Sequence, residues 1–387
     1  MTGDTMGMVE PTLHGYFDEM LRRRASDLFL EAGASPSFRV DGVIHKTNLP
    51  APDDADMRRH FDQVLTPLAA ERFAKSPDLD VAYTIPGVGR FRVNLFMAQS
   101  RLALVARAIP LGAVQFDSLH LPPVLLEMAD RENGLILVVG PTGCGKSTTL
   151  AAMLHHVNQS RTQHIVTIED PIEFVHEPLQ CIVHQRQVGV DAASFGTALR
   201  HVVRQDPDVI LIGEMRDRDT IETAFNAALT GHLILSTLHT TNVVQSVDRM
   251  LNYFPPEGRK QAQVDLANTL IGIASMRLLP RKDGPGRVPA VEVLRTTPTV
   301  RRLLTEGSFA ELYDIIKREG SAESGAQMQT FNQALYRLVR DGAITEQVAL
   351  HASPNADELR LNLEGMFTGI ESIDLRTADE DEEEEAG

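Results

Sequence analysis

The 387-residue sequence has few of the features that would place it in a membrane or outside a cell. No run of apolar residues reaches the roughly 20 that a membrane-spanning helix needs. The first residues lack a basic segment followed by an apolar one, so we expect no secretory signal. Two cysteines, Cys144 and Cys181, are too few for a four-thiolate zinc site and do not indicate an oxidising compartment. These absences predict a cytoplasmic protein that is at most peripheral to a membrane.

Positive charge is also scarce. The net charge is −16, and the seven acidic residues at 379–385 leave −9 for the remainder of the chain. This sign argues against nucleic acid as a partner, because surfaces that bind nucleic acid are usually basic. The sequence also shows no internal repeat.

What the sequence does contain is two different patterns of secondary structure. Residues 13–110 combine short strands, helices and hairpin turns, which predicts a small α+β domain with antiparallel strands. Residues 111–123 lack a clear period, and we expect a linker there. Residues 124–366 alternate strands with helices, the pattern of a parallel α/β sheet. Residues 1–12 and the acidic tail at 367–387 are expected to be disordered.

The expected elements follow from hydrophobic period and turn residues. In the first domain the longest expected helix covers 56–75. In the second domain we place strands at 135–139, 164–168, 208–212 and 233–238, with an edge or hairpin strand at 288–294. We place helices there at 146–157, 194–204, 217–228, 243–251 and, as a long amphipathic one, 262–278.

One stretch carries the strongest chemical signal, because residues 140–147 lie between a buried strand and a helix and match a phosphate-binding loop. Glycines let backbone N–H groups approach phosphate oxygens, and the helix N-terminus adds partial positive charge. Lys146 can reach the β- and γ-phosphates of a nucleotide, and the Ser147 hydroxyl can ligate Mg²⁺. The residues expected to bind the nucleotide are Gly140, Pro141, Thr142, Gly143, Cys144, Gly145, Lys146, Ser147 and Thr148.

Carboxylates follow two of the other expected strands. Glu214 comes after the third strand, and a phosphate-loop enzyme needs an acidic residue at the carboxyl end of a neighbouring strand to hold the hydration shell of Mg²⁺. Glu169, Asp170 and Glu173 follow the second strand, and each could orient or deprotonate an attacking water. Spacing alone does not choose among these three.

Histidines and arginines supply further candidates. His239 stands at the carboxyl end of the fourth expected strand, where it could donate to a γ-phosphate, whereas His232 at the other end is better explained as structural. Arg90 and Arg92 are two residues apart on an expected strand and therefore share a face, and Arg107 lies on another strand. From the residues alone, a solvated basic face explains these arginines better than a catalytic role.

Cys144 lies inside the phosphate loop, beside Lys146 and the start of a helix, and such an environment lowers the pKa of a thiol. A small residue tolerated at an open position of the motif is the simpler interpretation. A minor hypothesis is that alkylation or oxidation of this thiol blocks nucleotide binding.

Several stretches resemble the signatures of one family. Residues 203–217 resemble the signature of the secretion ATPases that serve type II secretion and type IV pili. Residues 167–173 resemble the Asp box of that superfamily, and residues 231–239 resemble its His box. Residues 26–30, 89–94 and 328–335 are similar to the twitching-motility, or pilus-retraction, ATPases of the PilT/PilU group.

The resemblance implies an α/β fold with a RecA-like phosphate-loop ATPase domain, preceded by a smaller α+β, PAS-like domain, in a homo-hexameric ring. It implies ATP and Mg²⁺ as ligands, and it makes Glu173 the catalytic base, which resolves the choice left open above. The other implied roles are nucleotide and metal binding for Lys146 and Ser147, the metal-holding Walker B carboxylate for Glu214, γ-phosphate sensing for His239, and charge supplied to a neighbouring site for Arg90, Arg92 and Arg107.

The implied activity is ATP hydrolysis that powers pilus retraction through an inner-membrane platform protein, at the cytoplasmic face of that membrane. Residues 299–304 read Thr-Val-Arg-Arg-Leu-Leu where PilT-type motors have Ala-Ile-Arg-Asn-Leu-Ile. Residues 328–335, residues 353–355 and the acidic tail look more like PilU, which favours an accessory motor beside a second, principal retraction ATPase.

Two alternatives stay open. The first is a pilus or pseudopilus assembly ATPase, although the four-cysteine metal-binding insert common in that class is absent from the sequence. The second is a ring regulator that binds nucleotide without hydrolysing it. The set of Lys146, Glu173 and Glu214 favours the enzyme.

Overall fold

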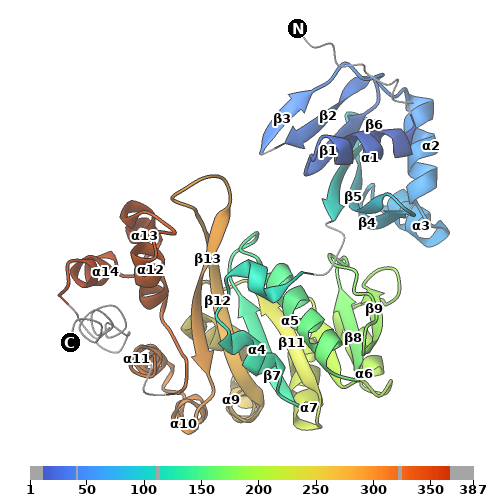
Figure 1. Ribbon diagram of the computed structural model, residues 1–387. Coiled ribbons are helices and arrows are strands. Elements are labelled where there is room, and N and C mark those ends of the chain that lie inside the picture. The colour runs from blue at the N-terminus through green and yellow to red at the C-terminus, as the bar shows by residue number, and fades with distance from the viewer. Residues whose placement is uncertain (1–11, 41, 110–113, 321–324, 367–387) are drawn as a thin grey trace. The chain divides into compact units, whose positions relative to one another are not determined.

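The structure is a computed structural model that describes residues 12–40, 42–109, 114–320 and 325–366 (Figure 1). The ends expected to be disordered lie outside these ranges, apart from Thr12. The chain divides into two compact units. The first comprises Met1–Gly112, Asp170–Val175 and Arg186–Ala193, and the second comprises Ala113–Glu169, His176–Gln185 and Ser194–Gly387.

The first unit is built on a six-stranded sheet in the order β3-β2-β1-β6-β5-β4. Every pair of neighbouring strands is antiparallel, as the sequence predicts. In β5 the residues from Phe91 to Leu95 alternate between buried and partly exposed, so one face of the sheet supplies the core. The strands are β1 (Asp27–Glu31), β2 (Ala34–Val40), β3 (Val43–Lys46), β4 (Asp78–Ile85), β5 (Gly89–Ala98) and β6 (Arg101–Ile109).

Helices α1 (Leu13–Arg22) and α2 (Asp54–Val64) fill the core of the first unit. Phe17 of α1 packs on Phe91 of β5, with ring centroids 4.1 Å apart. The single helix predicted at 56–75 is instead two helices. Thr66 caps a new helix, and Pro67 is the first residue of α3 (Pro67–Lys75), where a missing backbone N–H costs nothing.

The second unit is built on a seven-stranded sheet in the order β13-β12-β7-β11-β10-β8-β9. Neighbours from β12 to β8 are parallel, and β13 is antiparallel to β12. Strands β7 and β11 are buried along their whole length, as expected where both faces of a parallel sheet are covered. The strands are β7 (Gly134–Val139), β8 (His164–Glu169), β9 (Ile182–Gln187), β10 (Val209–Ile212), β11 (Leu233–Leu238), β12 (Leu270–Pro280) and β13 (Arg287–Arg295).

Helices α4 (Val124–Ala129) and α5 (Lys146–Ser160) pack their apolar side chains on this sheet (Figure 1). The next three helices start within one residue of their predicted positions, because Ser194, Asp217 and Asn242 each accept a backbone N–H as N-caps. Along the described ranges, no helix combines the length and apolar character needed to cross a bilayer. The helices are α6 (Phe195–Val202), α7 (Arg218–Leu229), α8 (Val243–Asn252) and α9 (Pro256–Thr269).

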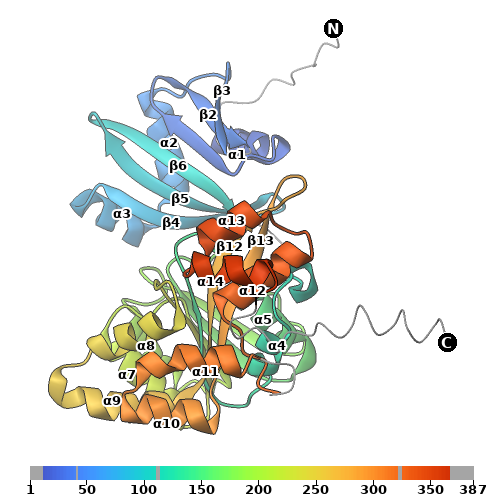
Figure 2. The same cartoon turned by 90° about the vertical axis from the view of Figure 1, so that its left-hand side faces the viewer.

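The C-terminal helices extend the second unit beside the β12–β13 hairpin. Helices α12, α13 and α14 share a small core with Leu279 and Val288 of these strands, and Figure 2 shows the three helices gathered together there. The bounds are α10 (Pro298–Glu306), α11 (Leu312–Arg318), α12 (Phe331–Arg340), α13 (Glu346–Ala352) and α14 (Ala356–Leu363), with short 3-10 helices at Phe116–Leu119 and Phe309–Glu311.

The helix predicted at 262–278 is wrong in its second half. Helix α9 ends at Thr269, and the following residues form β12 between β7 and β13. A Cβ added at Gly272 would lie 2.4 Å from the Leu294 carbonyl oxygen, so the neighbouring strand approaches very closely. The apolar run is buried by strands on both sides, a distinction that hydrophobic period alone cannot make.

The predicted domain boundaries stay predictions. Residues 113–123 fall in the second unit, where Phe116 and Leu121 of the expected linker belong to the core.

Glu292 of β13 makes the stability of the second unit depend on pH. Its side chain is 3 % exposed and accepts a hydrogen bond from the Val243 backbone N–H at 2.8 Å. Burial raises the pKa of Glu292 from 4.5 to about 7, against the opposing effects of that hydrogen bond and of Arg277. The folded state therefore favours the neutral acid. The contribution of Glu292 to the free energy of unfolding is fully present below pH 4.5 and is lost as the pH rises through 7.

We expect Glu292→Gln to stabilise the protein against urea by roughly 2 kcal/mol more at pH 8 than at pH 5, because the amide keeps the acceptor and removes the charge. Unfolding curves of both proteins, followed by circular dichroism at the two pH values, measure this difference. Glu311→Gln, at an exposed glutamate of the same unit, is the matched control and should show none. An equal effect of the substitution at both pH values would contradict the raised pKa of the Glu292 carboxyl group.

Candidate active site

The carboxyl ends of the parallel strands β7, β11, β10 and β8 meet at one edge of the second unit's sheet. The loop that ends at Lys146 follows β7, and His239 directly follows β11. Glu214 comes two residues after β10, and Glu169 is the last residue of β8. Strand direction therefore brings four groups from distant parts of the sequence to the same edge.

The loop between β7 and α5 has a backbone suited to an anion. Gly140, Gly143 and Gly145 have φ values of 147°, 78° and 98°, which other residues rarely adopt. Lys146 is 8 % exposed, and its Nζ donates to the carbonyl oxygens of Gly140 (2.9 Å) and Pro141 (3.1 Å). Because α5 begins at Lys146, the partial positive charge of a 15-residue helix falls on this loop.

Four further residues of the predicted nucleotide site are accessible. Pro141 and Thr142 are exposed, and Ser147 and Thr148 in the first turn of α5 are partly exposed. The hydroxyl groups of this first turn are therefore open to a ligand held by the loop.

Close packing explains Cys144 better than reactivity does. A Cβ added at Gly140 would lie 2.5 Å from the Cys144 sulfur and 2.6 Å from the Met276 carbonyl oxygen. Cys144 is buried, and this burial raises the pKa of its thiol, although Lys146 and two backbone hydrogen bonds lower it. The predicted lowering of this pKa is wrong, because desolvation of the thiolate outweighs the nearby cation.

Glu214 and His239 form a hydrogen-bonded pair, with Nε2 of the imidazole 3.0 Å from Oε2 of the carboxylate. The guanidinium of Arg216 pairs with the other oxygen of the same carboxylate. Burial lowers the pKa of His239, and the positive charges of Lys146, Arg216 and Arg249 lower it further. Two groups predicted separately thus form one hydrogen-bonded pair at this edge of the sheet.

The strand order differs from the sequence expectation in one respect. We expected Glu214 on a strand next to the phosphate-loop strand, but β11 lies between β7 and β10. Hydroxyl groups of β11 fix the end of β10, because Ser236 donates to the Ile212 carbonyl oxygen (2.8 Å) and Thr237 to that of Gly213 (2.6 Å). The intervening strand therefore holds Glu214 and also carries His239.

The three carboxylates that spacing could not separate are divided between the units. Glu169 is 8 % exposed, and its Oε1 accepts hydrogen bonds from Thr167 Oγ1 (2.6 Å) and Gln185 Nε2 (3.2 Å). Asp170 and Glu173 lie in the 170–175 segment, which groups with the first unit. Glu169 therefore differs from the other two in its place, since it ends a strand of the second unit.

Gln185 of β9 is a candidate that sequence reasoning missed. The edge strand that carries it was not predicted, and nothing in the local sequence marks a glutamine as a partner of Glu169. The only available signal was the stretch 182–187 itself, whose polar and apolar residues follow no strict alternation.

The arginine candidates lie on one face of the first unit's sheet. Arg92 of β5 lies opposite Arg107 of β6, and Arg90 is two residues from Arg92. Arg92 pairs with Asp80 at 3.3 Å, and Arg107 pairs with the buried Asp27 at 2.8 Å. The shared face is as expected, and carboxylates of the same unit pair with Arg92 and Arg107.

His232 lies at the opposite end of β11 from His239. Its Nδ1–H donates to the Ala227 carbonyl oxygen at 2.8 Å, which ties the end of α7 to the start of the strand. This contact supports the structural interpretation of His232.

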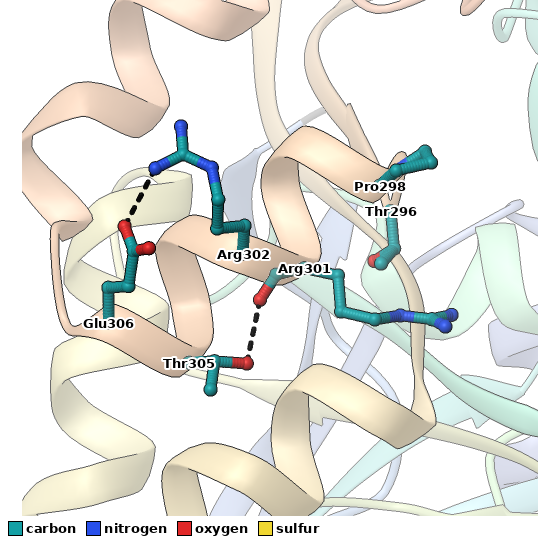
Figure 3. Close-up of a pocket in the computed structure, with 6 residues that line it drawn as sticks. All are labelled: Thr296, Pro298, Arg301, Arg302, Thr305 and Glu306. Carbon is teal, nitrogen blue, oxygen red and sulfur yellow. Dashed lines mark hydrogen bonds and ion pairs between the residues drawn. The ribbon is translucent and has the colours of Figure 1, made fainter.

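Two surface pockets lie in the second unit. One, of about 520 Å³, is lined by His239 together with Gln245, Asp248 and Arg249 of α8, so it adjoins the Glu214–His239 pair. The other, of about 420 Å³, is lined by residues of α10 and of the turn before it (Figure 3), and it includes Arg302, one of the residues that depart from the family motif at 299–304. In this second pocket Arg302 pairs with Glu306 at 2.8 Å, and Thr305 donates to the Arg301 carbonyl oxygen at 2.9 Å (Figure 3).

Known proteins align with this sequence over most of its length. It is 41 % identical to the type IV pilus retraction ATPase PilT of Pseudomonas aeruginosa over 328 residues, which cover 85 % of this chain and 94 % of PilT. It is 40 % identical to the type IV pilus ATPase PilU of the same organism over 342 residues, 88 % of each chain.

A solved structure agrees with the fold. The crystal structure of the pilus retraction motor PilT with bound ADP matches with a TM-score of 0.83 and 40 % identity, over 90 % of this chain and 99 % of that one. This match confirms the predicted α/β fold, a RecA-like phosphate-loop domain preceded by a smaller α+β domain. The family described as Type II/IV secretion system protein matches residues 3–302. The chain therefore belongs to the type II/IV secretion system protein family.

Proposed function

We propose that this chain is an ATP hydrolase that powers the retraction of type IV pili and hence twitching motility. The observation that supports this best is the phosphate loop of Lys146 at the sheet edge that also carries the Glu214–His239 pair. The likeness to PilT and PilU, over more than four fifths of each chain, supports the same activity.

In this proposal, residues 140–148 bind the phosphates of ATP. Backbone N–H groups of the loop and the start of α5 would contact the phosphate oxygens, and Lys146 would exchange its carbonyl partners for the β- and γ-phosphates. Since carbonyl oxygens already hold its ammonium group, the lysine stays directed at the loop.

Mg²⁺ fits the oxygen donors at this edge, the Ser147 hydroxyl and the Glu214 carboxylate. Among the residues the structure describes, no cluster of three His, Cys, Asp or Glu could hold a metal unaided. This agrees with an ion held largely by substrate phosphates and water. Such an ion neutralises charge that develops on the β- and γ-phosphate oxygens.

The remaining roles concern the reaction itself. We assign Glu173 as the base that orients and deprotonates the attacking water. His239 would contact the γ-phosphate, with its ring held in place by Glu214 at 3.0 Å. Arg90, Arg92 and Arg107 would supply positive charge to the site of a neighbouring subunit in a homo-hexameric ring.

The chain divides into two compact units, and in this proposal the loss of the γ-phosphate moves one unit against the other. In this proposal that movement turns a platform protein of the inner membrane, at its cytoplasmic face. The departure at residues 299–304 favours an accessory motor that acts beside a principal one, whereas the identities to PilT and PilU, 41 % and 40 %, do not distinguish the two roles.

Lys146→Ala should lower ATP turnover at least about 100-fold, because the phosphates lose their only loop cation. Phosphate release by the purified protein measures turnover, and circular dichroism checks that the fold persists. Lys260→Ala removes a lysine that contacts only the Thr305 carbonyl oxygen on α10, and this control should keep wild-type turnover. Turnover that survives in Lys146→Ala would refute the assigned nucleotide site.

Glu173→Gln should lower turnover roughly 100-fold or more while ATP still binds, because the amide keeps the shape of the side chain but cannot accept a proton. Single-turnover hydrolysis and equilibrium binding of a fluorescent ATP analogue separate the two effects. Glu169→Gln is the matched variant. A larger loss of hydrolysis in Glu169→Gln than in Glu173→Gln would move the role of base to Glu169.

The accessory role predicts a defined phenotype. Cells that carry this chain but lack a principal retraction motor should not twitch, whereas cells that lack only this chain should twitch under low load. Movement on agar and pilus retraction force in the two deletion strains measure this. Full retraction by this chain alone would identify it as a principal motor.

A further inference from the structure

The segment that carries Glu173 leaves and re-enters the second unit within a few residues. It departs after Glu169 and returns at His176, and a second excursion, 186–193, departs directly after Gln185. Three of the boundaries between the two units therefore fall at Glu169, His176 and Gln185.

A single side chain joins these three positions. The Gln185 amide donates through Nε2 to Glu169 Oε1 at 3.2 Å, and its Oε1 accepts the His176 backbone N–H at 2.8 Å. Each half of the amide has a partner of the opposite kind, so rotating the amide by half a turn would set donor against donor. Both ends of the 170–175 segment are thus held at one fixed separation.

Both ends are themselves firmly placed in the second unit. Glu169 is buried and also accepts a hydrogen bond from Thr167. The chain that follows His176 is tied to α5 by Asn158, which donates to the Glu177 carbonyl oxygen (2.8 Å) and accepts the Leu179 N–H (3.0 Å). Both ends of the 170–175 segment are therefore fixed without Gln185, and the role of Gln185 is to set the distance between them.

We propose that Gln185 is a positioning residue, which fixes the two ends of the 170–175 segment and thereby the direction in which Glu173 approaches the attacking water. This inference rests on the proposed role of Glu173 as the base. In this inference Gln185 acts through Glu173 and not on the nucleotide, so its effect should fall on the chemical step and not on nucleotide binding.

Gln185→Ala should lower kcat for ATP hydrolysis roughly 10- to 100-fold, the effect of losing a hydrogen bond to a buried charge together with a second one. The KM for ATP and the affinity for a fluorescent ADP analogue should stay within about twofold of wild type. The melting temperature should stay within a few degrees of wild type. Gln180→Ala is the matched control. Gln180 lies in the same stretch of chain, and its side-chain amide donates to the Gln159 carbonyl oxygen, so the removal of this side chain should leave kcat unchanged.

An exchange of donor and acceptor tests the contact directly. Gln185→Glu keeps the acceptor for His176 but sets a second carboxylate against Glu169, so kcat should fall at least as far as in Gln185→Ala. Adding Glu169→Gln restores a donor on one side and an acceptor on the other, so the double variant should recover at least about tenfold over Gln185→Glu.

The outcomes separate this inference from the proposed function. If wild type hydrolyses ATP and Gln185→Ala matches it in kcat, or if the double variant recovers nothing, the positioning role is wrong. If Gln185→Ala lowers the affinity for nucleotide as many-fold as it lowers kcat, and also lowers the melting temperature by more than a few degrees, Gln185 has only a structural role. The inference fails in that case too. If wild type itself shows no turnover, the proposed function fails instead.

Discussion

The parallel pairing of β7, β11, β10 and β8 is the constraint on which the site depends. Since these strands run the same way, their carboxyl ends deliver Lys146, His239, Glu214 and Glu169 to one edge, although the residues span almost a hundred positions of the chain. Side-chain hydrogen bonds from β11 to the last carbonyl groups of β10 keep this edge in register. Any change that shifted one strand by a residue would turn its side chain to the other face of the sheet.

The groups needed for the proposed chemistry are divided between the two compact units. The phosphate loop, Glu214 and His239 belong to the second unit, whereas Glu173 and the arginine face belong to the first. A base and a phosphate loop held on one rigid body would have a fixed geometry throughout the cycle. In the proposed mechanism, placing the two groups on separate units would let the state of the nucleotide influence whether Glu173 is in position.

Sequence reasoning succeeded where chemistry is encoded locally. The glycines and lysine of residues 140–148 occupy adjacent positions, and the caps at Ser194, Asp217 and Asn242 mark helix starts within one turn. It failed where long-range packing decides, as at Leu270–Pro280, where an apolar run becomes a strand because β7 and β13 lie on either side of it. It could not foresee Gln185, whose importance comes from two partners 9 and 16 residues away in sequence, nor that burial would outweigh the cation beside Cys144.

The carboxylate behind Arg107 has a consequence for how the arginine face meets an anion. Asp27 is 3 % exposed and already contacts Arg107, Arg39 and the Ser26 hydroxyl. An incoming phosphate would therefore compete with an acidic partner in place, and the contact would be an exchange of counter-ions. Because Asp27 stays in place and keeps Arg39 and Ser26 as partners, it offsets part of the attraction of Arg107 for an anion, so the contact should favour multiply charged, bidentate anions over chloride.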